Sequence, residues 1–397
     1  MLGGGPIAVS VTRSLGRATI PVLALGDRSW DTVHKSRYCT TFVDLGSGEG
    51  VQERWLEWLL SKPSEGAVVL ACSDDGIELV ARRREPLVEH GYNPMEANDR
   101  ALLAMLDKRR TYELSREAGV DAPRVATIHG IEGVDGALEA VGRTFPCALK
   151  PLHSHLFARY YGLNQKAFVV RDRRELDAVF IEVSQHRLEM MLTEIIPGRD
   201  DGHVSFWTYL DETGLPLFRF TKRKLRQYPP GFGLGCYHVT EWNPLVAELG
   251  SRFCKQVGIQ GIAIVEFKLD QRDGRFKLIE CNSRFPLAIE ILCRAGIDLP
   301  LLAYNRVLKR SNCGFMTART GVYLWFPVED VRALPEYRRR GEITAFAWCA
   351  SVLRRQHFPI WSVADPGPAI ANYRRLLRRA LVHARRRARA HVNSAAS

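Results

Sequence analysis

Two glutamates stand where a β-hairpin would place their carboxylates face to face. The alternation of apolar and polar residues across 261–282 predicts two strands joined by a turn. In the register that aligns the apolar faces, Glu266 lies directly opposite Glu280, and Asn282 projects from the same face as Glu280. Like charges so placed destabilise a sheet, which means that the pair needs a shared proton or a cation. Oxygen ligands in that number suit Mg²⁺ bound together with substrate phosphates.

The register of this hairpin decides the interpretation. It also places Phe267 opposite Ile279, and a slip of one residue would send the two glutamates to opposite faces. The alternative is an exposed hairpin whose acids pair with Lys268 and Lys277, because runs of charge usually mark solvated faces.

Three basic side chains stand at positions that favour an anionic partner. Lys108 follows Asp107 at a predicted helix start, where the helix dipole disfavours a cation unless an anion is bound. Lys150 ends an apolar strand, so its charge needs either solvent or an anion. Arg284 follows the hairpin and offers a fork for phosphate or carboxylate. The alternative for Lys108 is an ordinary surface lysine.

Two further lysines lie on one face of another predicted strand. Lys222 and Lys224 are two residues apart and therefore share one face of that strand, and Arg226 follows them. The glycine-rich segment 229–235 comes next and would allow close approach of the backbone to a ligand. It is equally typical of an ordinary connection between strands.

The elements that must position these residues change type along the chain. Apolar runs at Ile7–Val11, Ile20–Leu25 and Ala67–Ala71 predict strands separated by helical patterns, and therefore a doubly wound, parallel α/β unit over residues 1–97. Gly3–Ala8 fits the G-x-G-x-x-A dinucleotide pattern, but no strand precedes it, so we expect a bare turn.

From residue 98 on, helices mix with antiparallel strands. Residues 99–118 predict a helix in two pieces, and 205–224 predict a hairpin before the one at 261–282. This part of the chain therefore predicts an α+β architecture with antiparallel sheets.

The composition excludes several classes of protein. The 397 residues suggest two or three domains, and 46% hydrophobic with 25% charged residues exclude disorder throughout. The net charge of +12 is unusual, but eight arginines and no acid lie between Arg374 and Arg389. Most of the excess therefore belongs to the C-terminal segment, and it gives no argument for specific nucleic-acid binding by the main body.

The C-terminal segment and the cysteines give information on where in the cell the protein is found. Residues 373–397 predict a basic amphipathic helix that docks on an anionic membrane surface or an acidic partner; the alternative is a final helix packed on the body. The nine cysteines include no C-x-x-C pair, and the first residues show no basic region followed by an apolar run. These features predict a cytoplasmic protein that associates with membranes through its tail.

The order of these features resembles the ATP-grasp superfamily. It is most similar to carboxylate–amine ligases of the carbamoyl-phosphate-synthase-like and D-aspartate-ligase-like branch, over residues 1–310. The matching positions, in chain order, are Lys108, Lys150, Glu194–Gly198, Lys222, Lys224, Val265–Phe267 and Glu280–Arg284. The resemblance implies a pre-ATP-grasp α/β domain at 1–97, a two-lobed ATP-grasp domain at 98–312, a C-terminal subdomain at 313–372 and the basic tail.

The same resemblance implies a role for each candidate residue. The residues implied to bind ATP are Lys108, Lys150, Glu194, Ile195, Ile196 and Asp201. The two lysines would contact phosphates, with Lys150 also near the adenine. Glu194 would begin a hinge whose backbone reads the adenine amino group, and Asp201 would reach the ribose.

The remaining implied roles concern metal and chemistry. Glu266, Glu280 and Asn282 would hold one or two Mg²⁺ ions, for which Mn²⁺ could substitute. Arg284 would approach the transferring phosphoryl group. The residues implied to neutralise phosphate or the carboxylate substrate are Lys222, Lys224 and Arg226.

The implied reaction is ATP-dependent activation of a carboxylate as an acyl phosphate, which an amine then attacks. Such chemistry needs positioning and charge neutralisation more than a protein nucleophile. The partners are small-molecule carboxylate and amine substrates, and a homo-oligomer is left open. The alternatives are carboxyphosphate or acyl-phosphate chemistry with a different acceptor, and a non-catalytic nucleotide-binding scaffold docked by the tail.

One segment departs from the family pattern. Many ATP-grasp proteins have a glycine-rich phosphate lid where Pro151–Gln165 contains a single glycine. We expect Lys166 or the loop 231–235 to compensate for it.

Overall fold

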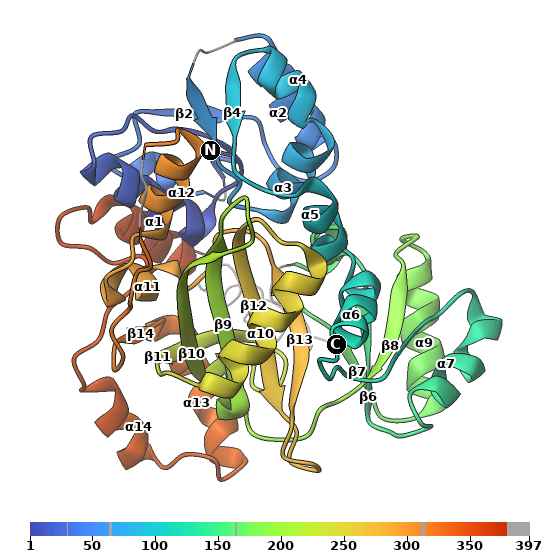
Figure 1. Ribbon diagram of the computed structural model, residues 1–397. Helices are drawn as coiled ribbons and strands as arrows, with labels where there is room; N and C mark the ends of the chain where they lie inside the picture. Colours follow the sequence, from blue (N-terminus) through green and yellow to red (C-terminus); the bar gives the residue numbers. More distant parts are fainter. Residues whose placement is uncertain (30, 63–65, 163–164, 311–313, 379–397) are drawn as a thin grey trace, which may run out of the picture.

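Antiparallel sheets form the middle of the molecule. The computed structural model describes residues 1–29, 31–62, 66–162, 165–310 and 314–378. The described strands form a six-stranded sheet, a four-stranded sheet and two parallel pairs. In Figure 1 the six-stranded sheet lies in the centre, the four-stranded sheet to the right and the N-terminal elements above. The predicted fold class, α/β and α+β with antiparallel sheets, is confirmed.

In the N-terminal region, Leu2 bridges the two parallel strand pairs. Leu2 pairs in parallel with both Leu25 and Ala71, and so connects the two parallel strand pairs. The elements of this region are α1 (Gly5–Arg17), β1 (Leu23–Gly26), β2 (Thr41–Asp44), α2 (Val51–Leu60), β3 (Ala67–Val69), α3 (Asp74–Arg82), α4 (Arg84–Glu89) and β4 (Tyr92–Pro94).

The predicted strand at Ile7–Val11 is wrong, because these residues lie inside helix α1. Gly3 and Gly5 turn the chain with φ of +83° and +71°, and Pro6 in the first turn is pre-set for a helix. Ala8, Val9 and Val11 of the run are buried, and so are the polar residues Ser10 and Thr12 beside them, so this part of the helix is buried all round. Leu2 takes the strand position instead.

The chain's own carboxylate closes the turn that begins α1. Asp31 accepts hydrogen bonds from the backbone N–H of Gly5 at 2.6 Å and of Asp27 at 2.8 Å. In a dinucleotide-binding turn, a phosphate would take this place at the helix N-terminus. The contact favours the bare turn expected for Gly3–Ala8.

The six-stranded sheet carries a core on each of its faces. Its strand order is β13-β12-β9-β10-β11-β14, and every neighbouring pair is antiparallel. Phe206 and Val265 pack with helix α10 on one face, while Trp207 and Ile264 join the core of the N-terminal elements on the other. Its strands are β9 (His203–Leu210), β10 (Pro216–Tyr228), β11 (Leu234–Thr240), β12 (Gly261–Leu269), β13 (Phe276–Asn282) and β14 (Tyr323–Trp325).

Helices precede, interrupt and follow the strands of this sheet along the chain. The predicted two-piece helix at 99–118 is confirmed, since Asp107 separates its halves by capping the second one. The helices are α5 (Asp99–Leu106), α6 (Lys108–Glu117), α10 (Pro244–Val257), α11 (Ile289–Ala295), α12 (Leu299–Val307), α13 (Pro327–Arg339) and α14 (Ala345–Val352).

The four-stranded sheet has the order β5-β8-β6-β7 and its own buried cluster. Its elements are β5 (Val125–Thr127), α7 (Val134–Ala140), β6 (Cys147–Pro151), α8 (Ser154–Tyr161), β7 (Phe168–Val170), α9 (Arg173–Ser184) and β8 (Met190–Glu194). Most buried residues of this sheet form that cluster, while Met191 of β8 packs with residues of the six-stranded sheet.

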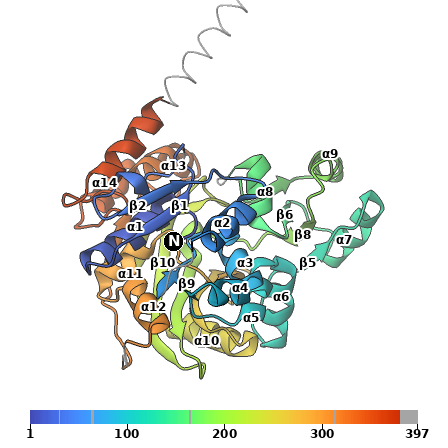
Figure 2. The same ribbon diagram turned by 90° about the horizontal axis from the view of Figure 1, so that it is seen from above.

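The end of the described chain returns to the first helix. Arg13 is buried, and it donates hydrogen bonds to the Asp365 carboxylate at 2.9 Å and to the Asp365 carbonyl at 2.7 Å. Figure 2 shows the helix of residues 367–378 leaving the body just after this contact. Residues 379–397 lie outside the described part, so the tail's docking stays a prediction. None of the described helices is long and apolar enough to cross a membrane.

A buried carboxylate ties β10, β14, α13 and α14 together. Asp330 is fully buried and accepts hydrogen bonds from Arg226 at 2.6 and 2.8 Å. The indole N–H groups of Trp325 and Trp348 also donate to it, at 2.8 and 3.0 Å. A buried charge with this many donors is stable only while its partners stay in place.

Replacing Asp330→Asn should therefore lower the free energy of unfolding by about 3–5 kcal/mol, because the Arg226 charge would stay buried without a partner. Urea denaturation followed by circular dichroism measures this loss. The control is Glu248→Gln, which removes an exposed pair with Arg252 and should cost less than about 0.5 kcal/mol. Equal effects of the two substitutions would contradict the assignment.

Candidate active site

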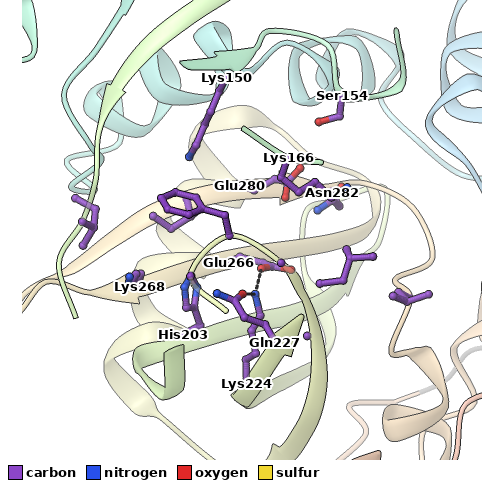
Figure 3. Close-up of a pocket in the computed structure, with 18 of the residues that line it drawn as sticks. Lys150, Ser154, Lys166, His203, Lys224, Gln227, Glu266, Lys268, Glu280 and Asn282 are labelled. Carbon is purple, nitrogen blue, oxygen red and sulfur yellow. Dashed lines mark hydrogen bonds and ion pairs between the residues drawn. The ribbon is translucent and has the colours of Figure 1, made fainter. Parts of the chain in front are cut away.

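A cavity of about 600 Å³ is lined by strands of both antiparallel sheets. Figure 3 shows charged side chains from both sheets pointing into it. The residues predicted for the site that line it are Lys108, Lys150, Glu194, Ile195, Ile196, Lys222, Lys224, Glu266, Glu280, Asn282 and Arg284. Asp201 and Arg226 are the two predicted site residues that do not.

The paired carboxylates lie as the sequence predicts. Glu266 on β12 is directly opposite Glu280 on β13. Asn282 lines the same cavity, and Figure 3 shows the three side chains together on the cavity side of the hairpin. Three oxygen-bearing side chains therefore converge at one end of the cavity.

The predicted pairing of Phe267 with Ile279 is wrong. Phe267 pairs with Leu278, because a β-bulge interrupts the ladder at that point. The carbonyl of Ile279 accepts a hydrogen bond from the Tyr112 hydroxyl at 2.8 Å. As a result Ile279 and Glu280, adjacent in sequence, both line the cavity.

Lysines approach both glutamates without closing a tight pair. Lys224 Nζ lies 3.7 Å from Glu266 Oε2, and Lys108 Nζ lies 4.0 Å from Glu280 Oε1. Burial alone would raise the pKa of Glu266, but the charges of nearby lysines, Lys224 foremost, hold it below its usual value. Glu266 is therefore ionised near neutral pH.

The alternative of an exposed hairpin is wrong. Lys277 pairs with Asp121 and Asp273 rather than with either glutamate, at 3.4 and 2.7 Å. Lys268 is buried against the cavity instead of extending into solvent.

The donor set fits a divalent cation. Within the described residues, no three His, Cys, Asp or Glu side chains gather as a complete metal site. Two carboxylates and one amide leave several coordination positions for water and phosphate, which is the usual arrangement for Mg²⁺. The residues that would hold the ion are Glu266, Glu280 and Asn282.

Lys108, Lys150 and Lys166 line the cavity on the side of the four-stranded sheet. Lys108 donates to the Ser154 hydroxyl at the start of α8. Burial, with the charge of Lys108 next, lowers the pKa of Lys150 to about 8. Burial also lowers the pKa of Lys166, which lines the same cavity. Desolvated amines of this kind are stabilised in the charged form by an anionic ligand.

The ammonium group of Lys222 contacts two aromatic side chains, Trp207 and His238. Its ammonium lies 5.3 Å from the centroid of the Trp207 ring and 3.2 Å from His238 Nδ1. Burial lowers the pKa of Lys222 to about 8, and burial keeps the pKa of His238 well below its usual value. Because this histidine is neutral, Nδ1 accepts from the lysine, and the other ammonium protons remain for a ligand.

The prediction that Arg226 meets substrate is wrong. The pairing of β10 with β11 is irregular between Lys224 and Gln227, so alternation is reset at that point. Gln227 then faces the cavity, while Arg226 turns to the opposite side and pairs with Asp330.

Asp201 does not lie where the ribose prediction puts it. It forms an ion pair with Arg199 at 3.4 Å and does not line the cavity. Its neighbour Asp200 is buried, accepting from the amide of Gln227 and from the backbone of Gly231 at 2.8 and 3.0 Å. The acidic turn thus supports the glycine-rich loop rather than the cavity itself.

The predicted adenine hinge follows strand β8. The Glu194 carboxylate accepts from the backbone N–H of Arg124 at 2.8 Å and from the Arg272 guanidinium at 3.0 Å. Its side chain is therefore occupied in holding the strand end. Ile195 and Ile196 line the cavity just beyond it, where their backbone groups can meet a base.

The start of α3 braces both sides of the cavity. Ser73 caps the helix, while Asp74 pairs with Arg284 and Asp75 pairs with Arg159 of α8. Burial opposes ionisation of Asp74, but the Arg284 guanidinium lowers its pKa to about 2. Arg284 is thereby fixed beside the hairpin.

Within the glycine-poor segment, residues Ser154–Tyr161 form helix α8. The segment 229–235, which connects β10 to β11, lines the cavity with six of its residues, Pro230 to Gly235. Lys166 lines the same cavity, and the covering of the phosphates by this loop or by Lys166 stays a prediction.

Sequence reasoning missed two buried groups of the site. His203 and Lys268 pair across β9 and β12 and both line the cavity. The place of Lys268 could have been found, since it is two residues beyond Glu266 on the same face. No local signal marks His203, because the pairing of β9 with β12 joins distant parts of the chain. Burial, then the charge of Lys224, keeps the pKa of His203 well below its usual value.

Comparison with known proteins finds one curated relative by sequence, while no protein-family model matches the chain. The chain is 28% identical over 232 residues to the D-aspartate ligase of Enterococcus faecium, which covers 56% of this chain and 54% of that protein. The chain thus matches about half the length of this relative.

Solved structures are similar over a larger share of the chain. The biotin carboxylase domain of the 2-oxoglutarate carboxylase from Hydrogenobacter thermophilus, solved with MgADP and bicarbonate, has a TM-score of 0.63 and 16% identity over 81% of this chain and 72% of its own. An L-amino acid ligase from Bacillus licheniformis has a TM-score of 0.59 and 15% identity, over 79% and 76%. The resemblance drawn from the sequence is confirmed: the chain has the ATP-grasp fold and is similar to the carboxylate–amine ligases of that superfamily.

Proposed function

We propose that the protein is an ATP- and Mg²⁺-dependent ligase that activates a carboxylate as an acyl phosphate and joins it to an amine. The observation that carries the proposal is the pair Glu266 and Glu280, directly opposed at the edge of a lysine-lined cavity. A binding site for a neutral ligand would have no use for such a pair.

The charges of the cavity suit phosphoryl transfer. The carboxylate oxygen of the substrate would attack the γ-phosphorus, ADP would leave, and the amine would then displace phosphate from the acyl phosphate. Lys108, Lys150 and Lys166 would neutralise the nucleotide phosphates, and Arg284 would face the phosphoryl group in transfer. When bound at the two glutamates, Mg²⁺ supplies further neutralisation of phosphate charge.

Lys222 and Lys224 are the cations available for the carboxylate substrate. Lys222 keeps unpaired ammonium protons above Trp207, and Lys224 stands between Gln227 and Glu266. The relative named D-aspartate ligase makes amino acids the first carboxylates to test. The partners proposed are a small carboxylate and a small amine, and self-association is a further proposal.

The test is ADP release by the purified protein with Mg²⁺ across amino acids, other carboxylates and bicarbonate. Hydroxylamine in place of the amine should trap the acyl phosphate as a hydroxamate. Activity with bicarbonate alone would favour carboxyphosphate chemistry. Nucleotide binding without ADP release from any carboxylate would favour a non-catalytic scaffold and overturn the proposal.

The Glu280→Gln substitution should reduce ADP formation by about 10²-fold or more, because it removes one of two opposed carboxylates that hold the cation. Steady-state ADP release measures the loss. Asp273→Asn is the matched control: it alters a carboxylate in the same hairpin that pairs with Lys277 outside the cavity. Full activity of the Glu280 variant would remove that residue from the site.

The Asp74→Asn substitution should lower kcat by about tenfold or more while leaving the KM for ATP nearly unchanged, because Arg284 would lose the carboxylate that orients it. The matched control, Asp75→Asn, frees Arg159 of α8 and leaves the Arg284 contact in place. A larger effect on kcat from the control than from Asp74→Asn would refute this positioning role.

Nucleotide affinity should fall above pH 8. Lys150 has a pKa of about 8 in the ligand-free protein, so it is charged below that pH and loses its proton above it. Isothermal titration with ADP should show affinity decreasing by up to about tenfold per pH unit between pH 8 and 10. Lys150→Arg, which stays charged, should flatten that decrease. An identical pH profile for the variant and the parent would exclude Lys150 from phosphate binding.

A further inference from the structure

Helix α14 is apolar on the side that faces away from the protein. The helix has no buried residue, although its sequence, Ala345–Val352, contains no charge. Phe346 and Leu353, at its two ends, are each 84% exposed. In Figure 1 the helix lies at the lower left edge of the molecule, far from the four-stranded sheet. Large apolar side chains this exposed, and this close together, mark an interaction surface.

The inner side of the same helix is fixed to the body. The Trp348 indole donates to Asp330 at 3.0 Å, and the Tyr237 hydroxyl donates to the carbonyl of Ser351 at 2.6 Å. These contacts set which side of α14 faces outward. The outward residues recur at helical spacing and form a stripe of four, Phe346, Cys349, Ala350 and Leu353.

Arginines border this stripe at both ends. Arg338 and Arg339 are exposed where α13 ends, Arg339 in an ion pair with Glu336, and Arg354 and Arg355 are exposed just after the stripe. Between residues 338 and 357, Glu342 is the only acid in the sequence. The surface is therefore an apolar ridge with positive charge at both ends.

The arginines at the two ends of the stripe discriminate among three partners that could cover it. A second copy of the chain in a twofold interface would bring the same arginines against one another. The chain's own segment 379–397 is itself rich in arginine and would be repelled in the same way. A surface with negative headgroups above an apolar layer matches both the ridge and its border. We propose that the α14 stripe docks the protein on an anionic lipid surface, with Phe346 and Leu353 entering the interfacial layer.

The test is flotation of the full chain with vesicles. Binding to vesicles of 30% phosphatidylserine and 70% phosphatidylcholine is expected at low salt, with little binding to phosphatidylcholine alone. Replacing Phe346→Ser together with Leu353→Ser should weaken binding by about tenfold or more, because two apolar side chains no longer leave water. ADP release should stay unchanged, since neither residue lines the active-site cavity.

Two control variants separate this surface from others. Val88→Ser with Leu215→Ser changes two other exposed apolar residues, 54% and 64% exposed, and should leave vesicle binding intact. Arg385→Gln with Arg386→Gln and Arg387→Gln weakens the tail alone, and the α14 effect should persist in that background. The proposal is overturned if binding depends only on the tail substitutions or is absent. It is equally overturned if sedimentation shows a dimer that the α14 variant dissociates.

Discussion

Two carboxylates held face to face are the constraint that the rest of the site has to meet. Glu266 and Glu280 oppose each other across one hairpin, and the nearest lysine nitrogens stand 3.7 and 4.0 Å away. Those distances exceed a direct hydrogen bond, so neither charge is fully matched. The lysines also disfavour one another, since Lys108 contributes to the lowered pKa of Lys150. The cavity therefore holds carboxylates and ammonium groups that do not fully neutralise one another. A bound metal ion could neutralise the carboxylates, and the phosphates of a nucleotide could neutralise the ammonium groups.

The ion pairs that hold the surrounding strands and helices in place are complete, in contrast to the charges of the two glutamates. Arg226 with Asp330, and Arg284 with Asp74, are buried or partly buried pairs whose charges meet directly. Complete pairs hold strands and helices in place, including where they line the cavity as Arg284 and Asp74 do, whereas the opposed glutamates and their lysines stay incompletely paired. This division lets the molecule keep a poorly compensated group of charges without losing the elements that carry it. Replacing an incomplete pair should therefore affect ligands more than folding.

Sequence alone predicted the opposed glutamates, because the apolar alternation of both strands admits a single register near them. It could not predict the bulge at Ile279, since an isoleucine suits either side of a strand and the deciding contact comes from a distant tyrosine. The same limit misplaced Arg226, where a second irregularity resets the alternation. The contact of Asp74 with Arg284 could not be predicted either, because it spans 210 residues.

The contact between Arg13 and Asp365 bears on the order in which the molecule can be completed. Both described hydrogen bonds of the Arg13 side chain go to a residue 352 positions later. During synthesis, the first helix emerges with a guanidinium destined for the interior and no carboxylate yet made to receive it. Domains often fold in turn as the chain lengthens. Here the buried contact of the first helix can form only after residue 365 has been synthesised.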